Sequence, residues 1–119
     1  MIYHITSRKA WRDAQQRGDY RAASLGTEGF IHCSTGTQVL PVAEKYYPRQ
    51  RGLLVLMIDP ARLTSELRRE PPAEGAPPPG VPVGEPFPHV YGPINLDAIV
   101  KVYDLETNPD GKHSVPTLD

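Results

Sequence analysis

Apolar and polar positions alternate over several short stretches of the chain, which is typical of strands with one buried face. The pattern predicts strands over residues 2–6, 30–34, 66–70 and 98–103, with an extended segment over 20–25. Residues 53–58 read Leu-Leu-Val-Leu-Met-Ile and are apolar throughout, so we expect a central strand buried on both faces. The polar stretch 66–70 fits the edge of a sheet.

The first helical segment follows the opening strand. Ser7 is a suitable N-cap, and Gly18 is a suitable C-terminal stop. We expect Trp11 to anchor this helix in the core, and Asp13 to pair with Arg17 on its surface, because residues four apart lie on one face.

A second helix is expected to begin at a Thr35 or Thr37 cap and to run to about Tyr47. Pro41 is compatible with it only in the first turn, where the missing N–H has no partner to lose. A short helical turn is expected over residues 60–65, after an Asp-Pro start signal.

Proline is concentrated in one part of the chain. Nine of the fourteen prolines lie between Pro71 and Pro93, where several glycines accompany them. Because proline lacks the N–H and fixes φ, this density argues against a helix or a central strand and predicts a long loop at about 71–88.

Length and composition narrow the class of protein. The 119 residues suit one domain, and two helices among five or six strands without strict alternation indicate an α+β fold. We expect a single domain over residues 1–105 and a flexible tail over 106–119. Lys and Arg number 13 against 14 Asp and Glu, so we expect no nucleic-acid partner, and no apolar run is long enough for a membrane helix. A single cysteine favours the cytoplasm.

Two short motifs carry candidate chemistry. His4 and Thr6 share one face of the first strand, and His32 and Ser34 share one face of a later strand. If the two strands lie in one sheet, both pairs line a common cleft, where imidazoles exchange protons and hydroxyls orient a ligand. Cys33, on the opposite face, is expected to be a small buried residue rather than a nucleophile.

A third candidate group follows the proline loop, where His89 and Tyr91 project to the same side of an extended segment. Tyr91 can stack on a planar ring, or its ring can close the core. We expect no metal site, because His4, His32 and His89 have no familiar ligand spacing.

Four segments, in this order, resemble the small bacterial family known as domain of unknown function 952. They are Ile-Tyr-His-Ile-Thr at 2–6, Glu-Gly-Phe-Ile-His-Cys-Ser at 28–34, the run 54–60, and Phe-Pro-His-Val-Tyr-Gly-Pro at 87–93. The resemblance covers about residues 1–105. It implies a remote similarity to the ADP-ribosyltransferase-like fold, in which two small, mostly antiparallel sheets with about two helices hold NAD in a cleft.

The resemblance also implies roles for individual residues. His4 matches the position that contacts a ribose of NAD, and Ser34 with Thr35 resembles the Ser-Thr segment of that fold. His32 and Ser34 would then orient the nicotinamide side, and Tyr91 would stack. The late glutamate of active transferases has no recognisable match in this chain.

Three functions therefore remain open. The first is binding or processing of NAD or a related nucleotide, with His32 and His89 as catalytic residues and His4, Thr6, Ser34, Thr35 and Tyr91 as binding residues. The second is a two-histidine phosphodiesterase, in which one imidazole is the base and another the acid. The third is a small-ligand-binding or protein-interaction domain without turnover.

Overall fold

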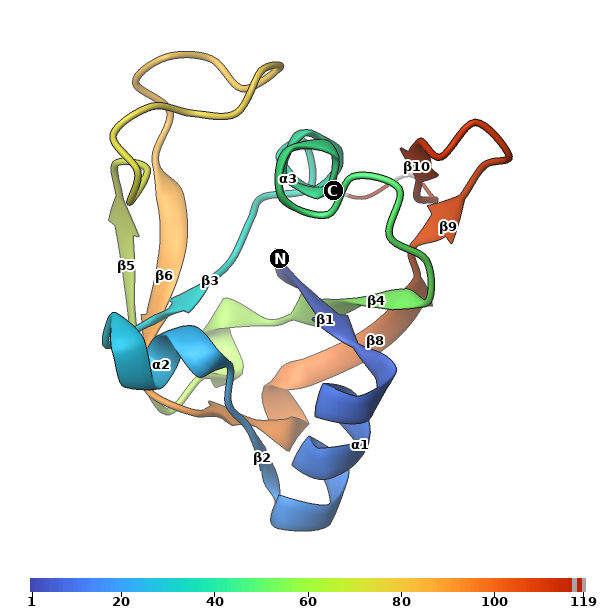
Figure 1. Cartoon of the computed structure of the whole chain (residues 1–119). Helices are drawn as coiled ribbons and strands as arrows, with labels where there is room; N and C mark the ends of the chain where they lie inside the picture. The colour runs from blue at the N-terminus through green and yellow to red at the C-terminus, as the bar shows by residue number, and fades with distance from the viewer. Residues whose placement is uncertain (117, 119) are drawn as a thin grey trace.

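Short strands and three α-helices make up the computed structural model, which describes residues 1–116 and 118 (Figure 1). The helices are α1 (Arg8–Arg17), α2 (Ala23–Thr27) and α3 (Val39–Tyr46), with 3₁₀ turns at Pro60–Arg62 and Leu96–Ala98. The strands are β1 (Ile2–Ser7), β2 (Asp19–Tyr20), β3 (Ile31–His32), β4 (Leu53–Ile58), β5 (Glu66–Glu70), β6 (Phe87–Tyr91), β7 (Ile94–Asn95), β8 (Ile99–Asp104), β9 (Glu106–Thr107) and β10 (His113–Ser114). Small antiparallel sheets with helices around them confirm the mixed α and β class predicted from the sequence.

The first three-stranded sheet has the order β1-β4-β8, and both pairings are antiparallel. β4 is its central strand, as its continuous apolar sequence predicts. His4 pairs with Leu56 and Thr6 with Leu54 across β1 and β4. This register places the two polar side chains on one face of β1.

The second three-stranded sheet has the order β3-β6-β5, with β5 at the edge as predicted. The expectation that the proline-rich region holds no central strand is wrong for β6, which contains Pro88. The backbone N–H of Cys33 donates to the carbonyl of Pro88 at 3.0 Å, so the carbonyl of Pro88 faces β3. The N–H that proline lacks faces the same side, beyond the two-residue strand β3, and therefore no bond to β5 is lost.

A two-way backbone bridge joins the two sheets. The N–H of Tyr3 donates to the carbonyl of Ser34 at 2.8 Å, and the N–H of Ser34 donates to the carbonyl of Tyr3 at 2.7 Å. β1 and the residues after β3 therefore run side by side, which brings the two polar motifs of the sequence together.

Helix α1 matches its predicted boundaries. The Ser7 hydroxyl accepts from the N–H of Ala10, and Gly18 ends the helix at a φ of 102°, a conformation that favours glycine. One expectation was wrong. Asp13 pairs with Lys9 rather than with Arg17, whose guanidinium instead bonds to the Asp19 carboxylate just beyond the helix. Trp11 packs against the buried core, as predicted, but is only half-buried, and Ala14 is the fully buried residue of the helix.

The other helices depart further from the sequence pattern. The segment expected to be extended over 20–25 instead enters helix α2, because only Asp19 and Tyr20 pair as a strand, with β7. Helix α3 begins after Gln38 and has no side-chain cap, so neither Thr35 nor Thr37 caps it. The Gln38 side chain accepts from the N–H of Thr35 instead. The 3₁₀ turn after Asp59 is confirmed.

The proline loop and the C-terminal hairpin lie on either side of α3 (Figure 1). Gln38 is fully buried, and its amide donates to the Glu85 carboxylate at 2.8 Å and to the Pro86 carbonyl at 3.0 Å. Within residues 106–119, for which the sequence predicts a flexible tail, His113 is buried in the β9–β10 hairpin. Its Nε2 bonds to the Tyr47 carbonyl at the end of α3.

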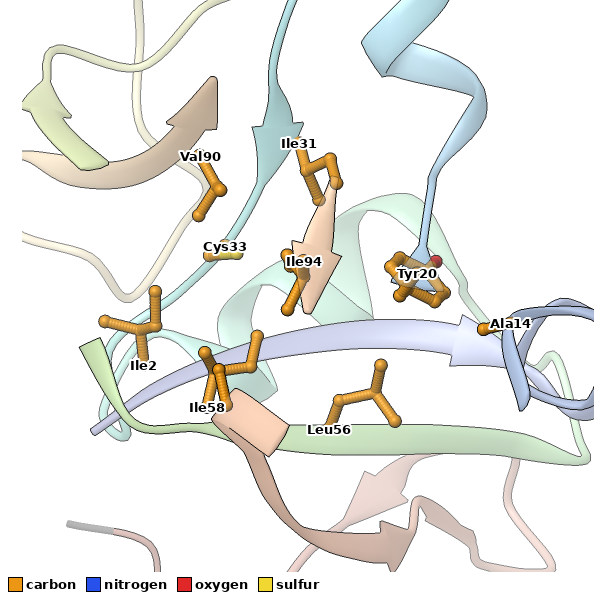
Figure 2. Close-up of a cluster of buried hydrophobic side chains, with 10 residues drawn as sticks. Ile2, Ala14, Tyr20, Ile31, Cys33, Leu56, Ile58, Val90 and Ile94 are labelled. Carbon is orange, nitrogen blue, oxygen red and sulfur yellow. The ribbon is translucent and has the colours of Figure 1, made fainter. Parts of the chain in front are cut away.

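Two apolar clusters lie on opposite faces of β1. Side chains from α1, β1, β2, β3, β4, β6 and β7 form the larger cluster, which Figure 2 shows with Ile2, Ile31, Leu56, Val90 and Ile94. Cys33 lies in this cluster, as predicted, and burial raises the pKa of its thiol to about 12. The smaller cluster joins Tyr3 and Ile5 to α3 and to β4. Among the described residues, no helix has the length and apolar character needed to cross a membrane.

Candidate functional site

A cleft of about 510 Å³ opens where the two sheets meet. That volume is in the usual range for small-molecule sites. The two sequence motifs and His89 of β6 supply polar side chains to its wall, and α2, α3 and the proline loop also contribute. Its lining residues are His4, Ile5, Thr6, Ser7, Ala10, Tyr20, Arg21, Ala22, Ala23, Ser24, His32, Cys33, Ser34, Val42, Tyr46, Tyr47, Gln50, Leu53, Pro72, Ala73, Glu74, Pro78, Phe87 and His89.

His4 occupies the junction between the two sheets. Its Nδ1 lies 2.5 Å from the carbonyl oxygen of His32, and its Nε2 lies 2.8 Å from the Tyr20 hydroxyl. A carbonyl only accepts, so Nδ1 carries the proton and Nε2 accepts from Tyr20. The Tyr20 oxygen in turn accepts from the Thr6 hydroxyl at 2.8 Å. Both ring nitrogens of His4 are therefore held by the protein.

Burial sets the ionisation of this chain of hydrogen bonds. Burial lowers the pKa of His4 to about 4. The hydrogen bond to the His32 carbonyl raises this pKa, but its effect is smaller than that of burial. Burial also raises the pKa of Tyr20 to about 12. At neutral pH the imidazole of His4 is therefore uncharged and the Tyr20 hydroxyl keeps its proton.

His32 and His89 lie directly opposite each other on β3 and β6. Their ring centroids are 5.6 Å apart, with the rings nearly perpendicular. The ring of Phe30 stacks on His89 at 4.2 Å and meets the edge of His32 at 4.8 Å. The side chain of His89 is only 4% exposed, whereas that of His32 is 45% exposed, so one member of the pair is buried and the other meets solvent.

Each of these two histidines has its own carboxylate. His32 Nε2 donates to Glu28 at 2.9 Å, and His89 Nδ1 donates to Glu70 at 2.8 Å. The same oxygen of Glu70 also accepts from the Tyr91 hydroxyl at 2.6 Å. The bonds from Tyr91 and His89 hold the pKa of Glu70 below its usual value. Glu70 is therefore anionic at neutral pH and orients the ring of His89.

The carboxylates of Glu28 and Glu70 each bind one nitrogen of an imidazole, and this determines which ring nitrogen has no protein partner. Among the described residues, nothing bonds to His32 Nδ1 or to His89 Nε2, and both rings line the cleft. A carboxylate that holds one nitrogen leaves the other as the site of proton exchange. The pair can therefore take a proton at one ring and give one at the other.

The structure brings five of the seven predicted site residues to one cleft. They are His4, Thr6, His32, Ser34 and His89. Thr35 and Tyr91 lie outside its lining. The N–H of Thr35 is bound by Gln38, and the Tyr91 hydroxyl is bound by Glu70 while the Arg68 guanidinium lies 4.3 Å above its ring.

Sequence reasoning missed two residues that contact the predicted ones. Tyr20 precedes the β2–α2 turn, and Glu70 ends a polar edge strand. Neither lies in a motif, and each reaches its histidine from 16 or 19 residues away. Glu28, just before the strand that carries His32, is by contrast predictable from the sequence as a residue that can orient His32, and its carboxylate accepts from that ring.

The charge of the cleft is nearly balanced. Arg21 is its only lining Lys or Arg among the described residues, and both oxygens of Asp19 bind its guanidinium. Within the part of the chain that the structure describes, no three His, Cys, Asp or Glu side chains are arranged to hold a metal ion.

Comparison with solved structures finds protein CC0527 from Caulobacter crescentus. Its crystal structure matches with a TM-score of 0.80 and 30% identity, over 95% of this chain and 92% of that chain. Its solution NMR structure matches with a TM-score of 0.66 and 32% identity, over 97% and 90%. A search among curated proteins finds no match. Residues 5–102 match the family described as "Protein of unknown function (DUF952)", and the chain therefore belongs to the DUF952 family.

Proposed function

We propose that this protein is an acid–base enzyme that binds a small nucleotide in the cleft and cleaves a phosphodiester bond with His32 and His89. The observation that carries the proposal is the cross-strand pair of imidazoles, 5.6 Å apart, each oriented by a carboxylate. Cleavage of a phosphodiester needs one group that takes a proton from the attacking oxygen and another that gives a proton to the leaving oxygen. Two adjacent imidazoles with one free nitrogen each meet that requirement.

We assign the role of base to His89 and that of acid to His32. The assignment follows burial, because the exposed ring of His32 loses less hydration when it carries the positive charge. His89 Nε2 takes a proton from a water whose oxygen forms a bond to phosphorus. The bond from phosphorus to the leaving oxygen breaks, and His32, which enters the step as the imidazolium with protons on both nitrogens, gives its Nδ1 proton to that oxygen. A cyclic phosphodiester opens by the same step to a monoester.

Several neighbours act through these two rings rather than on the substrate. Tyr91 holds Glu70, which orients His89, so Tyr91 is a positioning residue in this account. His4 binds the carbonyl of His32 and fixes the backbone that carries the second ring. The hydroxyl of Ser34 has no bond to another described residue and lines the cleft, where it can donate to a phosphate oxygen.

The second candidate is cleavage of the glycosidic bond of NAD, the reaction class implied by the ADP-ribosyltransferase-like resemblance. The aromatic side chains of Phe87, Tyr46 and Tyr47 on the cleft wall favour it, because they suit a planar ring. The predicted contact of His4 with a ribose would have to replace its bond to Tyr20, since both ring nitrogens are already held. We therefore place the phosphodiester first.

A product assay separates the two reactions. The protein is incubated with a 2′,3′-cyclic nucleotide and with NAD, and phosphorus NMR and nicotinamide release are followed. The proposal expects a monoester product from the cyclic nucleotide, a loss of at least about a hundredfold in His32→Gln and in His89→Gln, and unchanged amide spectra away from the site. Nicotinamide release without a monoester would favour the second candidate. If neither the monoester nor nicotinamide is formed, both candidate reactions are overturned.

A further inference from the structure

Part of the cleft wall comes from the C-terminal end of helix α3 and from the proline loop, and this part is called the α3 end below. Helix α3 ends there with Tyr46 and Tyr47, and the proline loop supplies Glu74. Tyr46 is 42% exposed, so much of its side chain is open to a ligand. From these three residues we infer that this end is a subsite for a planar organic cation.

The charges around Glu74 support a positive ligand. Among the described residues, no Lys or Arg forms an ion pair with Glu74, and the only Lys or Arg that lines the cleft, Arg21, pairs with Asp19, which it shares with Arg17. The end of the cleft therefore attracts a cation and repels an anion.

The aromatic rings of the α3 end also favour a flat cation as the ligand. The faces of tyrosine rings attract cations, and a flat cation can stack on a ring while a carboxylate meets its charge. Tyr46 and Glu74 both line the cleft, and Glu74 is one of the groups that act electrostatically on the Tyr46 hydroxyl, so the ring and the carboxylate lie near each other. Burial, and then the neighbouring Glu74, raise the pKa of Tyr46, which therefore stays a neutral donor.

The proline loop makes this subsite rigid. Pro72 and Pro78, which flank Glu74 in the sequence, also line the cleft. Gln38 fixes the end of the loop through Glu85 and the Pro86 carbonyl. Proline reduces the conformational freedom that a loop loses on binding. The dense prolines of the sequence therefore have a role here, since they restrict the segment of the loop that carries the Glu74 carboxylate.

The test compares two ligands of the same shape at pH 8, N-methylpyridinium and uncharged pyridine. Isotope-labelled protein is titrated with each, and amide shifts are followed. We expect saturable shifts at Tyr46, Tyr47 and Glu74, with the cation binding about tenfold more tightly than pyridine. Glu74→Gln should remove most of that preference, whereas Glu66→Gln, an exposed carboxylate outside the cleft, should leave it unchanged.

Equal binding of the two ligands, shifts at other residues, or an unchanged preference in Glu74→Gln would each overturn the subsite. The subsite does not rest on the acid–base proposal. His32→Gln, which that proposal expects to be inactive, should bind N-methylpyridinium as tightly as the natural sequence does. Failure of one claim is thus visible without failure of the other.

Discussion

His4 donates a hydrogen bond from Nδ1 to the backbone carbonyl of His32, which lies 28 residues later in the sequence. The nitrogen and the carbonyl oxygen are 2.5 Å apart. This bond, together with the Tyr3–Ser34 bridge, joins the β1-β4-β8 sheet to the β3-β6-β5 sheet. It lies beside the cleft that both sheets line. The backbone of the proposed acid, His32, is therefore positioned by a residue of the other sheet.

The Tyr20 hydroxyl should contribute strongly to stability. Tyr20→Phe leaves His4 Nε2 without its donor and Thr6 without its acceptor in a buried place, so we expect a loss of about 1–3 kcal/mol in the free energy of unfolding. Urea unfolding at pH 7.5 measures it. Tyr103→Phe is the matched control, because the Tyr103 hydroxyl has only a 3.7 Å contact to the Met57 sulfur and should cost less than about 0.5 kcal/mol. Equal losses would contradict the hydrogen-bond account.

Stability should fall in acid because of His4. Its pKa is about 4 in the folded protein and about 6.5 in the unfolded chain, so the unfolded chain binds the extra proton between these values. The stabilisation is complete above pH 6.5 and is lost as the pH falls toward 4, by up to about 3 kcal/mol. Urea unfolding of the natural sequence and of His4→Gln at pH 7.5, 6 and 4.5 should show a shallower pH dependence in the variant. Parallel curves would show that His4 does not titrate in this way.

Glu70 should control the protonation of His89. Glu70→Ala removes the acceptor of both the His89 Nδ1–H and the Tyr91 hydroxyl. We expect the proton of neutral His89 to shift partly to Nε2, and the rate of phosphodiester cleavage to fall at least about tenfold. Long-range ¹H–¹⁵N spectra of the imidazole report the first change. Glu66→Ala, on the same strand, should alter neither the spectrum nor the rate.

Gly92 should not tolerate a side chain. Its φ is 155°, and a Cβ there would lie 2.4 Å from the Ser65 hydroxyl, which donates to the Pro93 carbonyl. Gly92→Ala should lower the free energy of unfolding by about 1–3 kcal/mol, seen as a lower melting temperature. Gly26→Ala, in helix α2 with open space around it, should be neutral or stabilising by up to about 1 kcal/mol. A tolerated Gly92→Ala would show that Ser65 moves aside at little cost.

Local patterns were sufficient to predict much of this fold. The Ser7 cap, the Gly18 stop, the buried strand β4 and the edge strand β5 each depend on neighbouring residues alone. The shared faces of His4 with Thr6 and of His32 with Ser34 follow from the period of two in a strand. These predictions needed no knowledge of which strands pair.

What the sequence could not supply depends on contacts between distant residues. Pro88 fits a central strand only because its neighbour β3 is two residues long, and Tyr20 joins the site only because β2 pairs with β7. His113 is buried because the β9–β10 hairpin packs on α3, which no local pattern of a polar tail indicates. Alternation gives the face of a side chain, but the pairing of strands decides which faces meet.

The most direct test of the central claim follows the side-chain nitrogens of His32 and His89 during titration with a 2′,3′-cyclic nucleotide. Long-range ¹H–¹⁵N spectra resolve all four nitrogens. The account predicts saturable shifts that are largest at His32 Nδ1 and His89 Nε2, with the nitrogens bound to Glu28 and Glu70 changing least. Unchanged imidazole resonances at millimolar nucleotide would contradict it, because a ligand in the cleft would then not meet the two rings.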